Sequence, residues 1–147
     1  MASKARVRGG NNLKHMLNAA KYGGVRGVRV GFFATAKYPD GTPVTSVAAK
    51  NEFGIGVPER PFMRRANDVL KGEIGDYLKT AIDPKTMRVT EIIAGQIGLK
   101  AEFAVQKSIT DLRSPPNAPS TVRRKRSSNP LIHTEKMRES VDSEVIK

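Results

Sequence analysis

The chain has 147 residues, a formal net charge of +12 and no cysteine. This length suits one domain, and the lack of cysteine excludes a disulfide framework and a thiolate metal site. The sequence has no apolar run near the roughly 18 residues that a membrane span needs, and its basic first residues lack the apolar segment of a signal peptide. We therefore expect synthesis in the cytoplasm and no contact with a membrane.

The positive charge is concentrated in the two flanks of the chain. Residues 1–39 carry eight basic and no acidic side chains, residues 40–112 carry ten of each, and residues 113–138 carry seven basic side chains against one acidic. The last nine residues carry three acidic side chains and one basic. A neutral centre with basic flanks is typical of a scaffold whose ends meet acidic partners, either DNA or acidic protein surfaces.

The first part of the chain predicts an arm, a helix and a strand. Residues 1–11 contain charge and glycine without apolar periodicity, so we expect a flexible basic arm. Its basic side chains are Lys4, Arg6 and Arg8. Asn12 can cap a short helix that ends at Gly23. Alternating apolar residues over 28–33 predict a strand with one apolar face, and residues 38–43 (YPDGTP) predict a turn.

Residues 44–66 form the stretch around which we expect the fold to be organised. Thr45 or Ser46 can cap a short helix, and Gly54 and Gly56 supply the permissive backbone of a helix end and a tight turn. Two prolines then stiffen the entry into a second helix, in whose first turn the missing N–H of the second proline costs nothing. The structural anchors of this stretch are Phe53, Gly54, Pro58, Pro61 and Phe62, with both phenylalanines predicted in the core.

Two long helices follow. The first is predicted over residues 62–82 by an apolar stripe at helical spacing. Asp83 and Pro84 predict the start of the second, at about 85–109. The predicted stripes are Phe62, Ala66, Val69, Leu70, Ile74, Tyr77, Leu78 and Ala81 in the first, and Val89, Ile92, Ile93, Ile97, Ala101, Ala104, Val105 and Ile109 in the second. Gly95 and Gly98 either mark a close approach of another backbone or are simply tolerated.

The last third of the chain predicts a proline-rich linker, two short helical segments and a strand. Residues 113–120 form the linker, 121–126 a helical turn, and 134–140 a short helix or turn. Residues 141–146 alternate like a strand, most naturally paired with residues 28–33. We therefore predict a single α+β domain over residues 12–147, with a small antiparallel or mixed sheet packed against two long helices. The extended basic N-terminal arm and a proline-rich basic loop at 113–130 complete this prediction.

The polar side chains do not suggest catalysis. A hydrolase or nuclease needs converging carboxylates or paired histidines, whereas His15 and His133 lie far apart in the sequence and fit a surface and a turn position. The glycine pairs lack the strand-to-helix setting of a phosphate-binding loop. We expect no catalytic residue, no metal site, no cofactor and no enzymatic activity.

A run of four cations is the main candidate contact site. Arg123, Arg124, Lys125 and Arg126 could follow DNA phosphates through salt-sensitive contacts. They could instead bind the acidic face of a neighbouring subunit or form a solvated loop; contact with protein or DNA is favoured over solvation alone. No recognition helix for specific DNA reading is evident.

Two blocks of the sequence carry a resemblance. A strand ending VGFF, a YPDGTPV turn and then VAAKNEFG and PERPFMRRA form the first block, and PPNAPSTVRRKRSSNPLIHTEKMRESV forms the second. Together these resemble a family of small virion proteins of tailed bacteriophages, namely the neck, tail-completion or head–tail joining proteins. Where that family favours an Asp-Thr-Gly turn, this chain has His133, Thr134 and Glu135.

The resemblance implies a structural protein of a virion neck or tail top that joins heads to tails. It further implies a homo-oligomeric ring of six or twelve copies around the DNA channel, with other neck, connector or tail proteins as partners. Non-specific contact with DNA in the channel would be compatible with this role. The alternative from the residues alone is a non-specific, basic, architectural nucleic-acid-binding protein.

Overall fold

The computed structural model describes residues 25–82 and 89–147. It has an α+β fold, as predicted, with a two-stranded antiparallel sheet and several helices. The elements are β1 (Gly27–Phe32), α2 (Val44–Phe53), α3 (Phe62–Ala81), α4 (Glu91–Asp111), α5 (Pro119–Lys125), α6 (Lys136–Glu139) and β2 (Val141–Ile146). The predicted arm of residues 1–11, the helix starting at Asn12 and the cap at Asp83 lie outside the described residues.

The sheet pairs the first described strand with the last. Gly27 lies opposite Ile146 and Phe32 lies opposite Val141, so the predicted pairing of these two segments is confirmed. A two-stranded sheet is marginal unless something covers it. Here α4 packs along both strands and supplies that cover.

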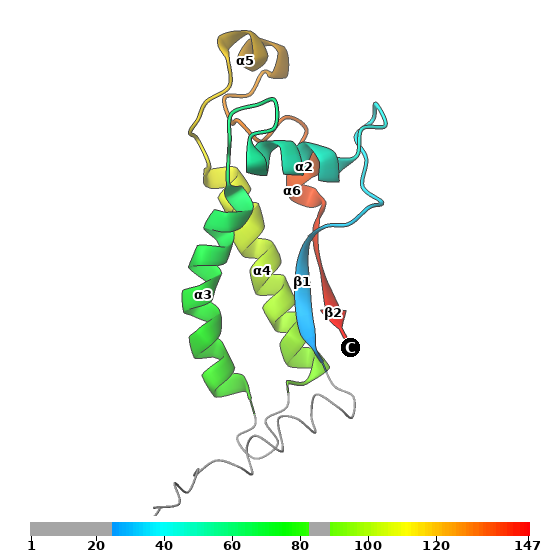
Figure 1. The fold of residues 1–147 in the computed structure, drawn as a ribbon, viewed down its shortest axis with the longest axis vertical. Coiled ribbons are helices and arrows are strands. Elements are labelled where there is room, and N and C mark those ends of the chain that lie inside the picture. Colours follow the sequence, from blue (N-terminus) through cyan, green and yellow to red (C-terminus); the bar gives the residue numbers. More distant parts are fainter. Residues whose placement is uncertain (1–24, 83–88) are drawn as a thin grey trace, which may run out of the picture.

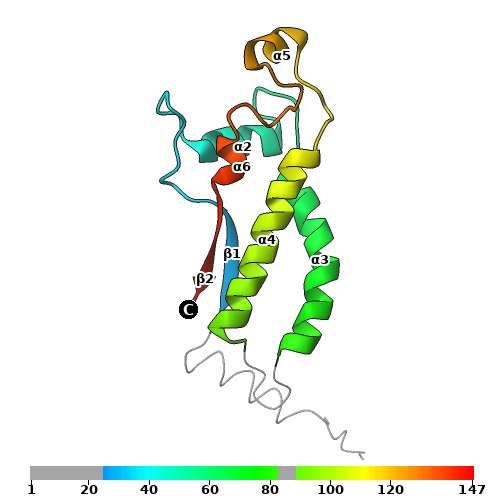
Figure 2. The ribbon, with the colours of Figure 1, turned by 180° about the vertical axis from the view of Figure 1, so that it is seen from behind.

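Helix α4 is the centre of the molecule, with β1 and β2 on one side and α3 on the other (Figures 1 and 2). Gly98 allows the close contact with the sheet, because a Cβ at this position would lie 2.5 Å from the Ser143 hydroxyl of β2. The predicted close approach of another backbone is therefore wrong, because the atoms nearest to Gly98 belong to the side chains of Ser143 and Val28. Gly95 faces open space and is simply tolerated.

The core lies where α2, α3, the C-terminal half of α4 and α6 meet. Its largest fully buried side chains are Phe62, Ile109, Leu112, Val44 and Val105. Phe62 meets Phe32 of β1 edge to face, with ring centroids 6.0 Å apart. The prediction that Phe62 is a core residue is confirmed.

The corner between α2 and α3 differs from the prediction at its start. Helix α2 begins at Val44, with no side-chain cap from Thr45 or Ser46. The N–H of Val44 instead donates to the Ala36 carbonyl at 3.0 Å, so tertiary contact replaces the local cap. At its other end, Gly54 has φ 68° and closes α2 as predicted.

Three predicted core residues are exposed. Phe53 is 65% exposed, Val69 59% and Ile92 75%, so these assignments are wrong. In each case the neighbouring positions of the same helix, such as Glu52 on α2 and Leu70 on α3, face the core instead. The predicted start of the second long helix is also wrong, because α4 begins only at Glu91 and Thr90, just before it, has an extended backbone. Thr90 caps α4 by accepting the N–H of Ile93 at 3.3 Å.

Candidate interaction surfaces

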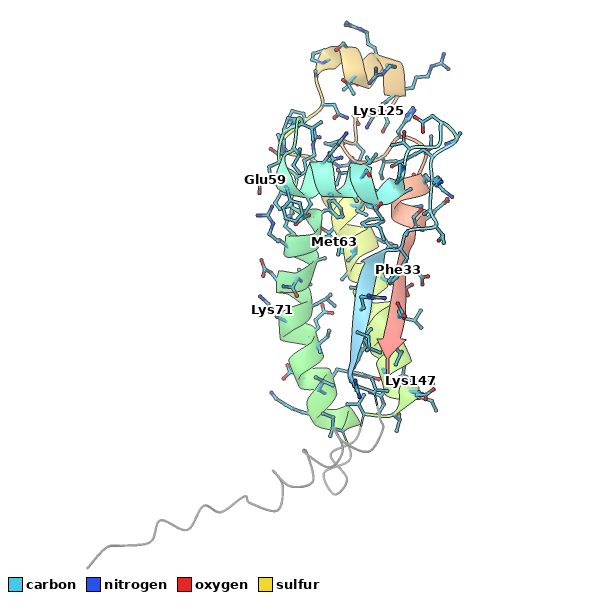
Figure 3. All side chains as sticks on the ribbon, turned by 45° about the vertical axis from the view of Figure 1, so that its right-hand side comes forward. Phe33, Glu59, Met63, Lys71, Lys125 and Lys147 are labelled. Atoms are coloured by element: carbon cyan, nitrogen blue, oxygen red, sulfur yellow. The ribbon has the colours of Figure 1, made fainter. Side chains whose placement is uncertain are left out.

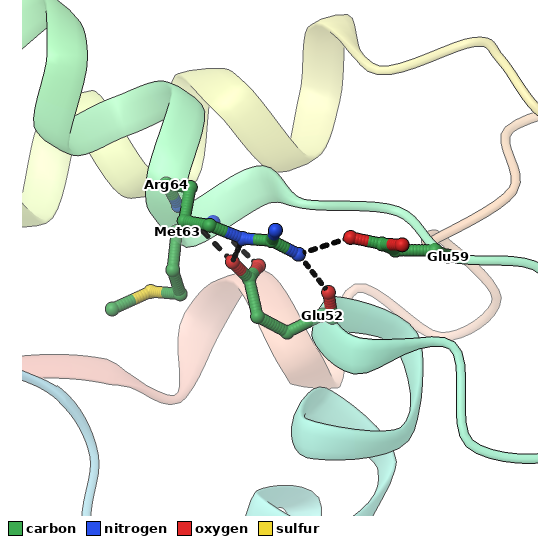
Figure 4. Close-up of polar contacts among 4 residues, drawn as sticks. All are labelled: Glu52, Glu59, Met63 and Arg64. Carbon is green, nitrogen blue, oxygen red and sulfur yellow. Dashed lines mark hydrogen bonds and ion pairs between the residues drawn. The ribbon is translucent and has the colours of Figure 1, made fainter.

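A buried carboxylate joins α2 to α3. Glu52, at the end of α2, is only 5% exposed. Its Oε2 accepts the backbone N–H of Met63 at 2.8 Å, and its Oε1 accepts the backbone N–H of Arg64 at 3.2 Å (Figure 4). Pro61, which precedes α3, provides no side-chain cap. Glu52 therefore caps α3 from another helix, where a negative charge is favoured by the helix dipole.

The Arg64 side chain covers the solvent side of this carboxylate. Its Nε donates to Glu52 Oε1 at 3.0 Å, and its Nη2 donates to the Glu52 carbonyl at 2.6 Å and to Glu59 at 2.5 Å. The guanidinium also lies over the ring of Phe53, 6.0 Å from its centroid. These contacts fix the exposed Phe53 ring beside the start of α3.

A second buried polar residue, Arg60, ties the α2–α3 loop to the proline-rich segment. Arg60 is 3% exposed. Its Nε donates to the Pro115 carbonyl at 3.0 Å, and its Nη2 donates to the Pro116 carbonyl at 3.2 Å and to Asn117 Oδ1 at 3.1 Å. Its Nη1 donates to Asn51 Oδ1 at 2.9 Å. Burial lowers the pKa of this guanidinium from its ordinary value.

The four predicted cations on and beside α5 do not form one surface. Arg123, Arg124 and Arg126 are exposed. Lys125 turns back toward the body of the molecule (Figure 3), where its Nζ donates to the Pro130 carbonyl at 3.2 Å. Burial and the positive charges of Arg60 and Arg124 lower the pKa of the Lys125 ammonium. Lys4, Arg6 and Arg8 lie outside the described residues.

An apolar groove lies between β1 and α3, with α2 at one end. It has a volume of about 550 Å³. We name it the β1–α3 groove; its apolar lining comprises Val30, Phe32, Ala48, Ala49, Phe53, Phe62, Met63, Leu70 and Val105. Met63 lies on the side of α3 that faces β1 (Figure 3). The edge of β1 that does not pair with β2 borders this groove.

A second apolar surface lies on the outer side of α4. Ile92, Leu99 and Phe103 are 75%, 65% and 67% exposed. At about 100° per residue, they lie roughly 120° to 160° around the helix axis from Val105, which lines the groove. We name these three residues the α4 ridge. The view of Figure 2 shows the side of the molecule on which α4 lies in front of the strands.

The remaining predicted sites have simpler positions. Gly54, Pro58 and Pro61 form the α2–α3 corner, with Pro61 just before α3 rather than within its first turn. His133 is exposed, and His15 lies outside the described residues. Within residues 25–82 and 89–147, no three potential metal-ligating side chains cluster together. Nor is any helix in these ranges both long and apolar enough to span a bilayer.

Sequence reasoning missed both Glu52 and Arg60. Their partners lie up to 57 residues away along the chain, as for Arg60 and Asn117, and no local motif marks such contacts. Searches against family models, curated proteins and solved structures found no match for this chain.

Proposed function

We propose that this chain is a structural subunit of a bacteriophage neck or tail top, which acts in head–tail joining or tail completion by assembling into a ring around the DNA channel. The observation that carries the proposal is that, among residues 25–82 and 89–147, two apolar surfaces are left uncovered, the β1–α3 groove and the α4 ridge, on opposite sides of one helix. The proposed role is non-enzymatic, requires no cofactor and places the protein in the virion.

The two surfaces differ in shape and so favour a heterologous contact. The ridge of one copy presents large apolar side chains, and the groove of the next copy presents an apolar hollow of about 550 Å³. Burying apolar surface stabilises such a contact by about 25 cal/mol per Å². Because each copy uses its ridge toward one neighbour and its groove toward the other, repetition gives a closed ring or an open filament.

The family resemblance gives this assembly its biological setting. At the turn where the family favours glycine, Glu135 has φ 61°, a backbone conformation that glycine adopts most easily. A positive φ at this position is compatible with a glycine-type turn there, although this chain carries glutamate. In the proposed ring, the basic arm of residues 1–11 and the loop at 113–130 reach neighbouring subunits or DNA.

Complementation between two variants tests the heterologous contact. Phe53→Glu places a charge in the groove, and Phe103→Glu places one on the ridge; both side chains are exposed, so the fold should survive. We expect the wild type to assemble at high concentration and each variant alone to stay monomeric in sedimentation velocity. An equimolar mixture should form heterodimers, because one intact groove and one intact ridge remain.

The control is Val69→Glu, which charges an equally exposed apolar residue outside both surfaces. It should assemble like the wild type. If the mixture of the two variants stays monomeric while the wild type assembles, the groove does not receive the ridge.

Electron microscopy tests the role in the virion. Negative-stain images of phage lysates with the gene disabled should show DNA-filled heads beside separate or abnormal tails, and the gene restored in trans should return intact particles. A gene lacking residues 1–11 should produce a folded subunit that fails to join heads to tails. Intact virions in the absence of the gene would refute the joining role.

The second candidate is non-specific binding to nucleic acid, which the three exposed arginines on and beside α5 favour. If it is the main function, duplex affinity should fall linearly with salt on a log–log plot, by a slope of about −0.9 for each phosphate contact. Replacing Arg123 and Arg126 by Gln should then reduce that slope by about two. A neck subunit should instead bind DNA weakly as a monomer.

A further inference from the structure

Arg60 is a buried cation whose hydrogen-bond partners are all neutral. Two are proline carbonyls and two are side-chain amide oxygens. The adjacent carboxylate, Glu59, is directed away to Arg64. Among the described residues, none of the ion pairs within 4.0 Å involves Arg60. A buried charge without a countercharge is costly, because dipoles offset only part of its lost hydration.

Two further cations line the same hollow. Lys125 and Arg124 reach it from α5, and Lys125 lies close enough to Arg60 and Arg124 to feel the positive charge of both. Neither forms an ion pair within the part of the chain that the structure describes. The lining also includes Asp40, whose Oδ1 instead accepts the N–H of Thr42 at 2.9 Å. The other titratable groups there are Tyr38 and His133.

The hollow combines this charge with apolar walls. Its volume is about 570 Å³. Its apolar walls come from Val47, Val57, Pro58, Pro116, Ala118, Pro130 and Leu131. A charged group at the base and apolar walls suit a single carboxylate side chain with apolar neighbours. A DNA backbone carries a charge at every phosphate, and the exposed Arg123 and Arg126, which lie outside the hollow, suit it better.

We propose that this hollow, bounded by Arg60, Arg124 and Lys125, binds an acidic peptide segment of a partner protein, with one carboxylate seated between the cations. The carboxylate would accept hydrogen bonds from the N–H groups that Lys125 and Arg60 retain, since Lys125 gives one of its three to Pro130 and Arg60 gives four of its five to neutral acceptors. This site does not depend on ring formation through the groove and ridge.

The test uses a short synthetic peptide with one glutamate flanked by leucines, together with its glutamine twin. Titration of the ¹⁵N-labelled full chain should shift the Arg60 Nε–H resonance with the glutamate peptide and leave it in place with the glutamine twin. Lys125→Gln should lower the affinity for the glutamate peptide by about tenfold, because one partly buried charge pair is lost. Lys50→Gln, the same change on an exposed α2 lysine outside the hollow, should leave the affinity unchanged.

A second lining variant and the peptide comparison decide between the proposal and its alternatives. Arg124→Gln, which removes a lining charge without touching the Arg60 hydrogen bonds, should also weaken the peptide, and circular dichroism checks that each variant is folded. Equal binding of the two peptides, or an affinity unchanged by both lining variants, would overturn the proposal. It would also be overturned if a DNA duplex shifted the Arg60 resonance and displaced the peptide, because the hollow would then be a phosphate site.

Discussion

The cap that Glu52 provides for α3 leads to the sharpest stability prediction. Glu52→Ala removes the acceptor of two backbone N–H groups at the start of a 20-residue helix. Hydrogen bonds to a charged group contribute about 1.5–3 kcal/mol each, and loss of a helix cap costs about 0.5–2 kcal/mol. Because Met63 is half-buried and Arg64 is exposed, water can replace part of the lost acceptor, and we expect a loss of about 2–3 kcal/mol.

Urea unfolding followed by circular dichroism at 222 nm measures this loss. Glu52→Gln keeps one acceptor oxygen but loses the charge, so about half of the loss should remain. Arg64→Ala should cost far less than Glu52→Ala, because the guanidinium is largely exposed and its removal leaves no buried N–H without an acceptor. Glu73→Ala, an exposed change on the same helix, should be near neutral. A Glu52→Ala loss below about 0.5 kcal/mol would refute the capping role.

Three further predictions use matched positions or a titration. Phe62→Ala should lower the free energy of unfolding by about 3–5 kcal/mol, and Phe53→Ala by less than about 1 kcal/mol; similar losses in urea unfolding would contradict the burial described above. Gly95→Ala should raise the free energy of unfolding by about 0.5–1 kcal/mol through helix propensity. Gly98→Ala should lower it, since the new Cβ would lie 2.5 Å from a serine hydroxyl of β2. Stability changes of the same sign for both variants in thermal unfolding would contradict this packing. Burial and then the charge of Asp40 raise the pKa of the Tyr38 hydroxyl, so the stability that neutral Tyr38 contributes is complete below pH 10 and is lost as pH rises toward the folded-state pKa. Tyr38→Phe should flatten this alkaline decline in the free energy of unfolding. An unchanged decline would exclude Tyr38 as its source.

The sequence predicts the regular elements of this fold better than its contacts. The strand pair is predictable because both segments alternate with period two, and α3 because its stripe has the helical period. The stripe does not say which of its members face the core, which is why Val69 and Ile92 were placed wrongly. Amphipathic spacing defines a broad face, and the narrow α4 interface uses only part of it.

The polar interior was beyond sequence reasoning for a different reason. Arg60 lies between an acidic residue and a proline in the sequence, and this local pattern predicts a solvated surface residue. Its burial depends on carbonyls of Pro115 and Pro116, which tertiary folding brings to it. The sequence likewise predicts that Glu52 is an exposed charge on a helix surface, because the contact with α3 that buries it depends on the tertiary fold. Of the four predicted contact cations near α5, Lys125 alone has a hydrogen-bond partner among the residues that the structure describes, and no local signal distinguishes it from Arg124.

The pairing of β1 with β2 has a consequence for how the chain folds. The paired residues are separated by more than a hundred positions, as Gly27 and Ile146 show, so most of the chain must be made before β1 finds its partner. Contacts of such long range slow folding. A nascent chain would therefore hold both edges of β1 bare until β2 emerges, and the strand would be open to pairing with another chain at the ribosome. Coexpression with a chaperone should raise the yield of folded subunit more than lower temperature alone.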